Sequence, residues 1–165
     1  MLFRSQYADI VRNEDTFRIF NIHLQTLRFS PSNRYYLNDP SIKNEDDITE
    51  SKSILKKFQK GQSKHHYQSD CIKKEVDKSP YPVILCGDFN DVPNSYAYNT
   101  IGKGFKNAFT EKGSAIGDTY DGISSTLRID NIFCDNRFNV EQFIRIKKKL
   151  SDHFPIIADL IYQHQ

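Results

Sequence analysis

Two polar side chains follow a short apolar run in residues 82–93, PVILCGDFNDVP. Residues 83–86 are too few for a helix and rich in β-branched side chains, which predicts a strand buried on both faces. Gly87 then permits a sharp backbone change. Asp88 and Asn90 are two positions apart, so in extended chain a carboxylate and an amide point the same way. An Asx turn that caps a following helix is the alternative.

Three other predicted strands carry polar side chains near one end. The candidates are His23 at the end of residues 16–25, Asp130 within residues 125–134, and the pair Asp152 and His153 just before residues 154–162. Four strands with this feature predict that the polar ends converge at one rim of the sheets. Each residue also has a plainer interpretation: His23 as a satisfied strand histidine, Asp130 as the ion-pair partner of Arg128, and the Asp152–His153 pair as a strand cap.

This set of side chains suits metal-assisted phosphate chemistry. Mg²⁺ or Mn²⁺ prefers hard oxygen ligands, and Asp152 could supply one. Asp88 could orient and deprotonate an attacking water. His153 could bind or protonate a phosphoryl oxygen while Asp130 holds its imidazole in one orientation. Asn90 could donate to a phosphate oxygen without adding charge.

Zinc is disfavoured as the metal. His65 and His66 are adjacent, so their rings cannot share one helix face, and we expect both to be exposed on a helix. Cys71, Cys86 and Cys134 lie far apart in the sequence, and none is at the spacing typical of zinc ligands from another cysteine or a histidine. The sequence has neither a phosphate-binding Walker loop nor a nucleophile elbow of the G-x-S-x-G type.

The elements that must position these residues are mostly strands. Alternation over residues 2–11 and 16–25, with 13–15 between them as a turn, predicts an antiparallel hairpin whose second strand is central. Residues 30–44 are predicted to be a loop. A helix is expected over 45–59, with Ile48, Leu55 and Phe58 on one side, then a break at Gly61 and a second helix over 62–77. A short helix over 95–101 and strands over 125–134, 138–147 and 154–162 complete an α/β or α+β layered fold.

Bulk composition sets broad limits. With 165 residues, the natural expectation is one domain. Charged residues make up 27% and nearly balance, with a net charge of +2, so no strong overall field favours nucleic acid. Residues 147–149 form a short basic run that we interpret as a solvated turn. The sequence has no membrane-spanning apolar run or signal peptide, and unpaired cysteines favour a reducing compartment.

Four segments, in order, resemble motifs of the endonuclease/exonuclease/phosphatase superfamily: NIHLQT (21–26), PVILCGDFND (82–91), RIDNIF (128–133) and SDHFPI (151–156). The resemblance runs from residue 16 to 160. It implies a four-layer α/β sandwich in which two mostly antiparallel sheets pack face to face with helices outside.

By the same resemblance, Asp88 would activate the water, Asn90 would contact the scissile phosphate, and His153, paired with Asp130, would stabilise the phosphoryl oxygens. Asp152 would sit at the metal, and His23 matches a second histidine of the phosphodiesterase-like members.

One departure from the family pattern concerns the start of the chain. Family members carry an Asn strand and a metal-binding Glu strand before the segment that matches residues 21–26, and no Glu here occupies such a strand. We therefore expect residues 1–165 to be one partial domain, the C-terminal portion, that binds metal weakly alone. Expected partners are a phosphate-ester substrate, the missing N-terminal part, and a second copy through unpaired sheet edges.

The leading functional hypothesis is a metal-dependent phosphoesterase that hydrolyses a phosphodiester or phosphomonoester with an activated water. Nucleic acid and phosphorylated lipid or inositol remain open as substrates. A non-catalytic binding module on the same fold is the alternative, and a structural α+β domain with accidental motif matches is a third.

Overall fold

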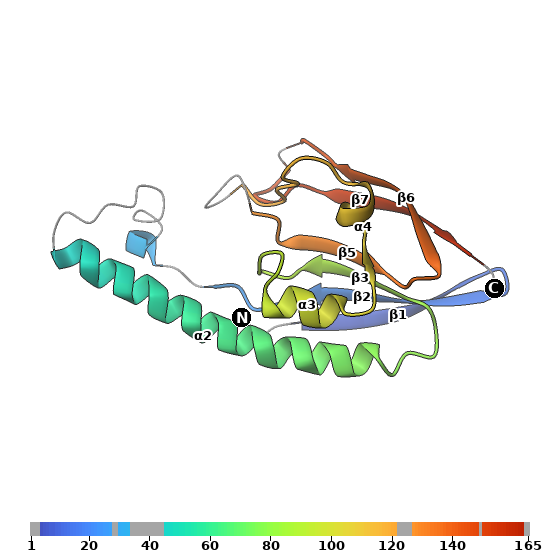
Figure 1. Ribbon diagram of the computed structural model, residues 1–165, viewed down its shortest axis with the longest axis horizontal. Helices are drawn as coiled ribbons and strands as arrows, with labels where there is room; N and C mark the ends of the chain where they lie inside the picture. The colour runs from blue at the N-terminus through green and yellow to red at the C-terminus, as the bar shows by residue number, and fades with distance from the viewer. Residues whose placement is uncertain (1–3, 28–29, 34–44, 122–126, 149, 164–165) are drawn as a thin grey trace.

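The computed structural model describes residues 4–27, 30–33, 45–121, 127–148 and 150–163, which form a mixed α/β fold with two sheets (Figure 1). The larger sheet has the order β1-β2-β3-β5-β4, and the smaller pairs β6 with β7. The elements are β1 (Arg4–Arg12), β2 (Asp15–His23), α2 (Glu45–Val76), β3 (Val83–Asp88), α3 (Tyr96–Gly102), β4 (Lys106–Asn107), α4 (Ala108–Lys112), β5 (Asp130–Cys134), β6 (Phe138–Arg145) and β7 (Ile156–Tyr162).

The predicted hairpin is confirmed. β1 and β2 pair antiparallel from Arg12 opposite Asp15 to Arg4 opposite His23, and Asn13 between them adopts a left-handed φ of 56°, which asparagine tolerates in turns. β2 is central, as expected, because β3 pairs parallel to it on the other side. β5 then runs antiparallel to β3.

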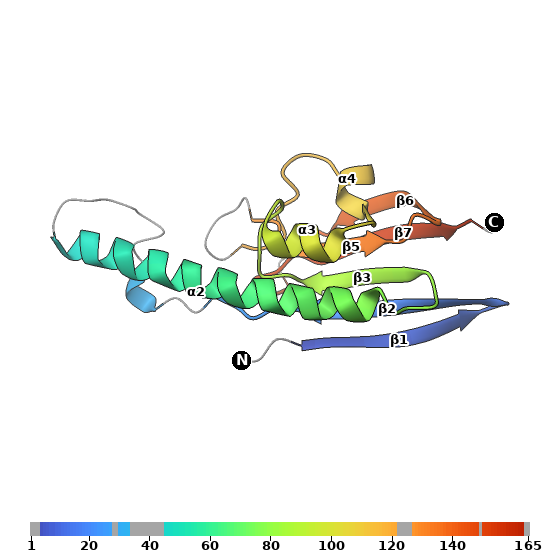
Figure 2. The same cartoon turned by 60° about the horizontal axis from the view of Figure 1, so that its bottom comes forward.

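Two apolar cores flank the larger sheet because side chains alternate along its strands. On one face Phe20, Leu85 and Phe133 pack with residues of α2 and α3, which lie on the same side of the sheet (Figure 2). On the other face Ile84 and Ile132 pack toward the smaller sheet. The polar ends of the strands are therefore held between two packed layers.

The predicted break at Gly61 is wrong, since α2 runs unbroken from Glu45 to Val76. An isolated glycine costs a helix only about 1 kcal/mol, and here it leaves room for Leu27, whose Cδ2 would lie 1.9 Å from an added Cβ. Because eighteen residues make five turns, Ile54 and Ile72 share one face, and both are buried.

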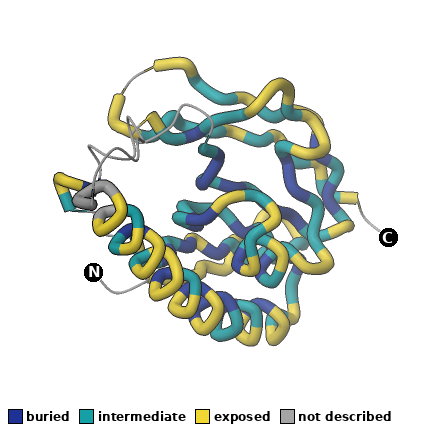
Figure 3. The backbone as a smooth tube through the Cα atoms, turned by 60° about the vertical axis from the view of Figure 1, so that its left-hand side comes forward, coloured by how far each residue is buried: buried dark blue, intermediate teal, exposed yellow. Residues whose placement is uncertain are grey.

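The apolar face expected for the first half of this helix is also wrong. Ile48, Leu55 and Phe58 are 42%, 58% and 38% exposed, because the continuous helix buries the side that carries Ile54 instead. Buried positions recur along α2 at helical intervals (Figure 3).

Several boundaries differ from expectation. The short helix after residue 90 is confirmed, with Ser95 accepting from the Tyr98 N–H as its N-cap. β5 begins at Asp130, and the described residues 127–129 before it are not part of the strand; β4 and α4 were not predicted. Residues 31–33 of the expected loop are helical, while 34–44, 122–126 and 149 lie outside the described residues. Within the described ranges, each helix is too short or too polar to cross a membrane.

Gly87 immediately precedes Asp88 in β3. We expect Gly87→Ala to lower the free energy of unfolding by about 3 kcal/mol or more. Its φ is +138°, and an added Cβ would lie 1.9 Å from the backbone carbonyl oxygen of Ile22 in the adjacent strand. Urea denaturation measures the loss. Gly104→Ala is the control, because φ there is +87° with open space around the Cβ position, so only about 1 kcal/mol should be lost. Equal losses in the two variants would contradict the steric argument.

Candidate functional site

Three polar side chains form a row across adjacent strands of the larger sheet. In the β2–β3 pairing His23 lies opposite Asp88, and in the β3–β5 pairing Asp88 lies opposite Asp130. Residues paired in this way project from the same face of a sheet. Since Ile84 shares that face with Asp88 and packs toward the smaller sheet, the row faces the space between the two sheets.

His153 reaches this row from the other side. Its backbone forms an antiparallel β-bridge with Tyr120. The centroids of the Tyr120 and His153 rings are 4.9 Å apart. His153 Nδ1 is 2.9 Å from Asp130 Oδ2. One ligand atom each from Asp88, Asp130 and His153 lie within 4.8 Å of one another. The structure thus brings together side chains that are far apart in sequence.

The Asp88 carboxyl lies in an environment that disfavours its charged form. Burial raises its pKa most, the Asn90 backbone N–H opposes that shift, and the nearby charge of Asp130 raises the pKa further. His23 Nε2 is 3.7 Å from Asp88 Oδ2 and lowers the pKa when protonated. The result is a carboxylate more basic than an exposed aspartate.

The His153 imidazole, by contrast, lies in an environment that favours its charged form. The hydrogen bond to Asp130 raises the pKa of His153 most, against the effect of burial, and the charges of Asp130, Asp88 and Asp152 add to the rise. Asp130 therefore fixes both the orientation and the protonation of this ring.

Asn90 is held against Asp88 by a turn and not by extended alternation. Asn90 has a left-handed φ of 47°. Its backbone N–H donates to Asp88 Oδ1 at 2.8 Å, which is the Asx turn left open by the sequence. Its amide Nδ2 donates to Asp88 Oδ2 at 2.8 Å and to the Leu24 carbonyl at 3.0 Å. Both amide N–H donors are thus engaged, and neither points to an empty space for phosphate.

Two predicted partners lie outside this cluster. Asp152 is exposed, and its backbone carbonyl accepts from the Asp121 N–H at 2.9 Å. Arg128 does not pair with Asp130. Its guanidinium lies 3.8 Å from the centroid of the Phe109 ring, and its Nε and Nη1 are buried without a hydrogen-bond partner.

The chemistry of the donor set fits a divalent cation that prefers oxygen. Asp88 and Asp130 offer carboxylates on neighbouring strands, and two like charges this close favour a cation between them. The His153 ring is less suited as a ligand, since its Nδ1 faces Asp130 and its raised pKa favours the protonated form. Cys86 and Cys134 contribute no zinc-like set, because the thiolates are disfavoured by burial, which raises both pKa values.

His65 was expected to be exposed on a helix, and that prediction is wrong. Its side chain is fully buried, with Nδ1 3.0 Å from Asp91 Oδ2 and Nε2 2.8 Å from the Gln25 carbonyl oxygen. The helix phase could have revealed it, since His65 lies seven residues, or two turns, before Ile72 on the buried face. His66 is exposed as expected, and its ring lies against that of Tyr96 in a tilted arrangement, with 4.1 Å between the ring centroids.

His65 ties α2 to both segments that carry site residues. Gln25 follows His23 by two positions, and Asp91 follows Asn90 directly. Because both ring nitrogens face oxygens that can accept, the doubly protonated imidazolium is the form that satisfies both partners. Burial alone lowers the pKa of His65, but the hydrogen bonds to Asp91 and to the Gln25 carbonyl outweigh it, so the net pKa is raised.

We expect His65→Gln to lower the free energy of unfolding by about 3 kcal/mol, because it leaves the buried Asp91 carboxylate without its cation. A raised pKa means that the stabilising charge is fully present below about pH 6.5, the usual histidine pKa, and is lost as pH rises through the folded value. Urea denaturation between pH 5.5 and 8.5 should therefore show a smaller decline with pH in the variant. The raised pKa of His153 contributes an equal pH dependence to the parent protein and to the variant.

The exposed neighbour provides the control for this measurement. His66→Gln should change the free energy of unfolding by no more than about 0.5 kcal/mol. An unchanged pH dependence in His65→Gln would show that the buried imidazole is not a cation.

Solved structures share this fold at low sequence identity. A functionally unknown conserved protein from Enterococcus faecalis matches with a TM-score of 0.66 and 16% identity, over 96% of this chain and 56% of its own. An endonuclease/exonuclease/phosphatase from Bacteroides vulgatus matches with a TM-score of 0.62 and 18% identity, over 96% and 55%. A mannosyl-6-phosphatase from Bacteroides thetaiotaomicron matches with a TM-score of 0.51 and 19% identity, over 91% and 53%.

The chain therefore spans about half the length of these solved structures. Among curated proteins, none matches this sequence. The family model described as Endonuclease/Exonuclease/phosphatase family matches residues 53–153, which is more than half of the chain and includes Asp88, Asp130 and His153. With the fold and the family model in agreement, the chain belongs to the endonuclease/exonuclease/phosphatase family.

Proposed function

We propose that this chain carries the hydrolytic centre of a metal-dependent phosphoesterase. The observation that carries the proposal is the convergence of Asp88, Asp130 and His153 within 4.8 Å, a carboxylate pair and an imidazole at the rim of two packed sheets. Family membership supports a phosphoesterase, and one protein of similar fold is a mannosyl-6-phosphatase.

Asp88 is the proposed general base. A carboxylate is a better base toward water at neutral pH when its pKa is raised, provided that it stays ionised. Burial supplies that rise, and the N–H groups of Asn90 hold both carboxylate oxygens in place. In this proposal Asn90 is a positioning residue for Asp88. To contact phosphate, the Asn90 amide would have to give up one of its two hydrogen bonds.

His153 is the proposed donor to the phosphoryl group. Its ring is oriented through Nδ1 by Asp130, which leaves Nε2 as the nitrogen to face substrate. A protonated imidazole donates to a phosphoryl oxygen and offsets negative charge that develops there. His23, 3.7 Å from Asp88, adds a second imidazole on the opposite flank of the base.

The proposed cation is Mg²⁺ or Mn²⁺, which would be held chiefly by the Asp130 carboxylate, with the exposed Asp152 at the rim and Asp88 close by as the base. When bound, such an ion supplies Lewis-acid polarisation of a phosphoryl oxygen. The chain's own carboxylates lose mutual repulsion on binding it, which makes both easier to keep ionised.

We further propose that additional chain completes this centre. The described residues bring only two carboxylates into the cluster, and apolar side chains on β1 and β7 are left exposed, with Ile10, Val11, Ile157 and Ile161 between 44% and 71% exposed. Segments that cover these strands, either upstream sequence or a second copy, would supply the further ligand. The isolated chain should accordingly turn over slowly.

Asp88→Asn and His153→Gln are expected to lower kcat/KM by about 100-fold or more each, because each removes a group that acts on the reacting atoms. The assay is hydrolysis of bis(p-nitrophenyl) phosphate with 5 mM Mg²⁺ by the chain alone and, in parallel, by the chain together with any natural sequence that adjoins it. Asp77→Asn is the matched control, since this aspartate is exposed just beyond the end of α2, and the activity of this variant should equal that of the parent protein. Full activity in Asp88→Asn and His153→Gln would refute the hydrolytic roles and favour a non-catalytic binding module.

Removal of divalent cations with EDTA should abolish hydrolysis, and added Mg²⁺ or Mn²⁺ should restore it. Asp130→Asn should raise the Mg²⁺ concentration required for half-maximal rate by about tenfold or more, because one of the two carboxylates is lost. Titration of the rate against Mg²⁺ for Asp130→Asn and Asp77→Asn measures the difference. Activity that survives EDTA would contradict the metal requirement.

A further inference from the structure

One stretch of α2 is strongly basic although the whole chain has a net charge of only +2. Residues 51–69 contain no aspartate or glutamate. They contain five lysines, which we call the α2 lysine row: Lys52, Lys56, Lys57, Lys60 and Lys64. All of these side chains are exposed except that of Lys57, which is half-buried.

The lysines gather on one side of the helix. Four of them recur every fourth residue, and at 100° per residue the five positions fall within an arc of about 140°. From Lys52 to Lys64 the row extends about 18 Å along the helix axis. Like charges at this spacing oppose helix formation, so the row is a surface whose charge a bound anion would relieve. Lys73 and Lys78, near the other end of the helix, instead pair with Asp77 and Glu75.

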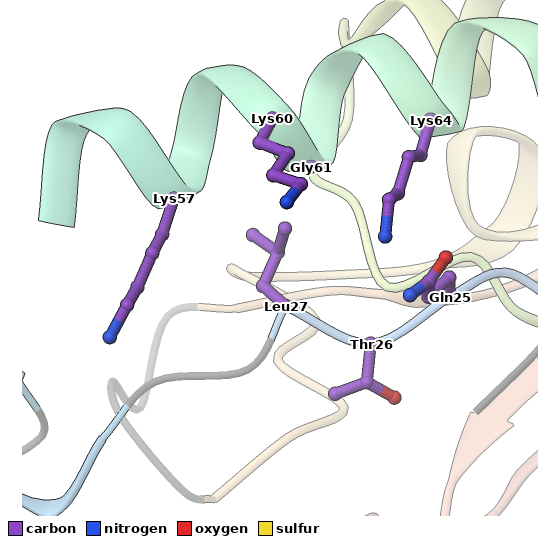
Figure 4. A pocket seen from close by; sticks show the side chains of 7 residues that line it. All are labelled: Gln25, Thr26, Leu27, Lys57, Lys60, Gly61 and Lys64. Carbon is purple, nitrogen blue, oxygen red and sulfur yellow. The ribbon is translucent and has the colours of Figure 1, made fainter. Parts of the chain in front are cut away.

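One end of the α2 lysine row lies beside the segment that follows β2, the strand that carries His23. Lys57, Lys60 and Lys64 line a pocket of about 190 Å³ together with Gln25, Thr26 and Leu27. In Figure 4 the Lys64 side chain extends from the helix toward this segment, whereas Lys57 Nζ donates to Ser30 Oγ and Asn33 Oδ1. The segment begins two residues after His23, and His65 binds its Gln25 carbonyl. One end of the α2 lysine row therefore adjoins the segment that follows His23.

We propose that the α2 lysine row binds the phosphate backbone of a single-stranded nucleic acid; the proposal rests on the phosphoesterase function for its connection to the site. A compact phosphate headgroup would contact one or two of these lysines, whereas a strand with regularly spaced phosphates follows all 18 Å or so of the row. Tyr67 lies within the same arc and is 69% exposed. An aromatic ring beside a line of cations offers a surface on which bases stack.

The test measures binding without hydrolysis. Fluorescence anisotropy in EDTA follows a labelled twelve-nucleotide single strand at several salt concentrations. Lys60→Gln combined with Lys64→Gln should weaken binding by about tenfold or more and reduce the slope of log K against log salt by about 1.4, since two phosphate contacts are lost. Tyr67→Ser should weaken binding with no change in that slope.

The matched control removes the same charge elsewhere. Lys103→Gln combined with Lys112→Gln takes two exposed lysines from outside α2 and should leave binding within about twofold. Equal weakening by both double variants would overturn the proposal, as would preferential binding to vesicles of phosphatidylserine and phosphatidylcholine. Asp88→Asn should bind the strand normally, so a failure of the row and a failure of the hydrolytic proposal are separate results.

Discussion

The candidate site depends on the register in which β2, β3 and β5 pair. That register sets His23 opposite Asp88 and Asp88 opposite Asp130. A slip by one residue would turn each side chain to the other face of the sheet, where the helices and not the smaller sheet lie. The close approach of Gly87 to the Ile22 carbonyl helps to define this register, because a side chain at that position has no room.

The strand residues of the site were within reach of the sequence, whereas the helix residues were not. The apolar run that ends in Asp88 and the predicted strand that carries Asp130 each indicate, from the sequence alone, a strand with a polar side chain at its end. His65 looked like an exposed residue because its neighbour is histidine too, and because Gly61 was interpreted as a break. Only the phase of an uninterrupted helix, which tertiary packing of Leu27 against Gly61 makes possible, turns His65 inward. Asp152 shows the converse: its motif was visible, but its exposed position depends on loop geometry that no local pattern encodes.

α2 has two roles that separate along its length. Its second half holds the segments around Gln25 and Asp91 through His65 and Gln68, and its first half extends the surface with the α2 lysine row. Overall charge conceals this division, because acidic residues elsewhere offset the lysines. Charge distribution along a helix is thus more informative here than net charge.

Both N–H donors of the Asn90 amide are committed, one to Asp88 and one to the Leu24 carbonyl. The orientation of the Asp88 carboxylate is therefore decided when the protein folds. The rotational entropy of that side chain is lost once, during folding, and does not have to be lost again in each catalytic cycle. An aspartate restrained in this way gains reactivity from its surroundings without any change in its own chemistry.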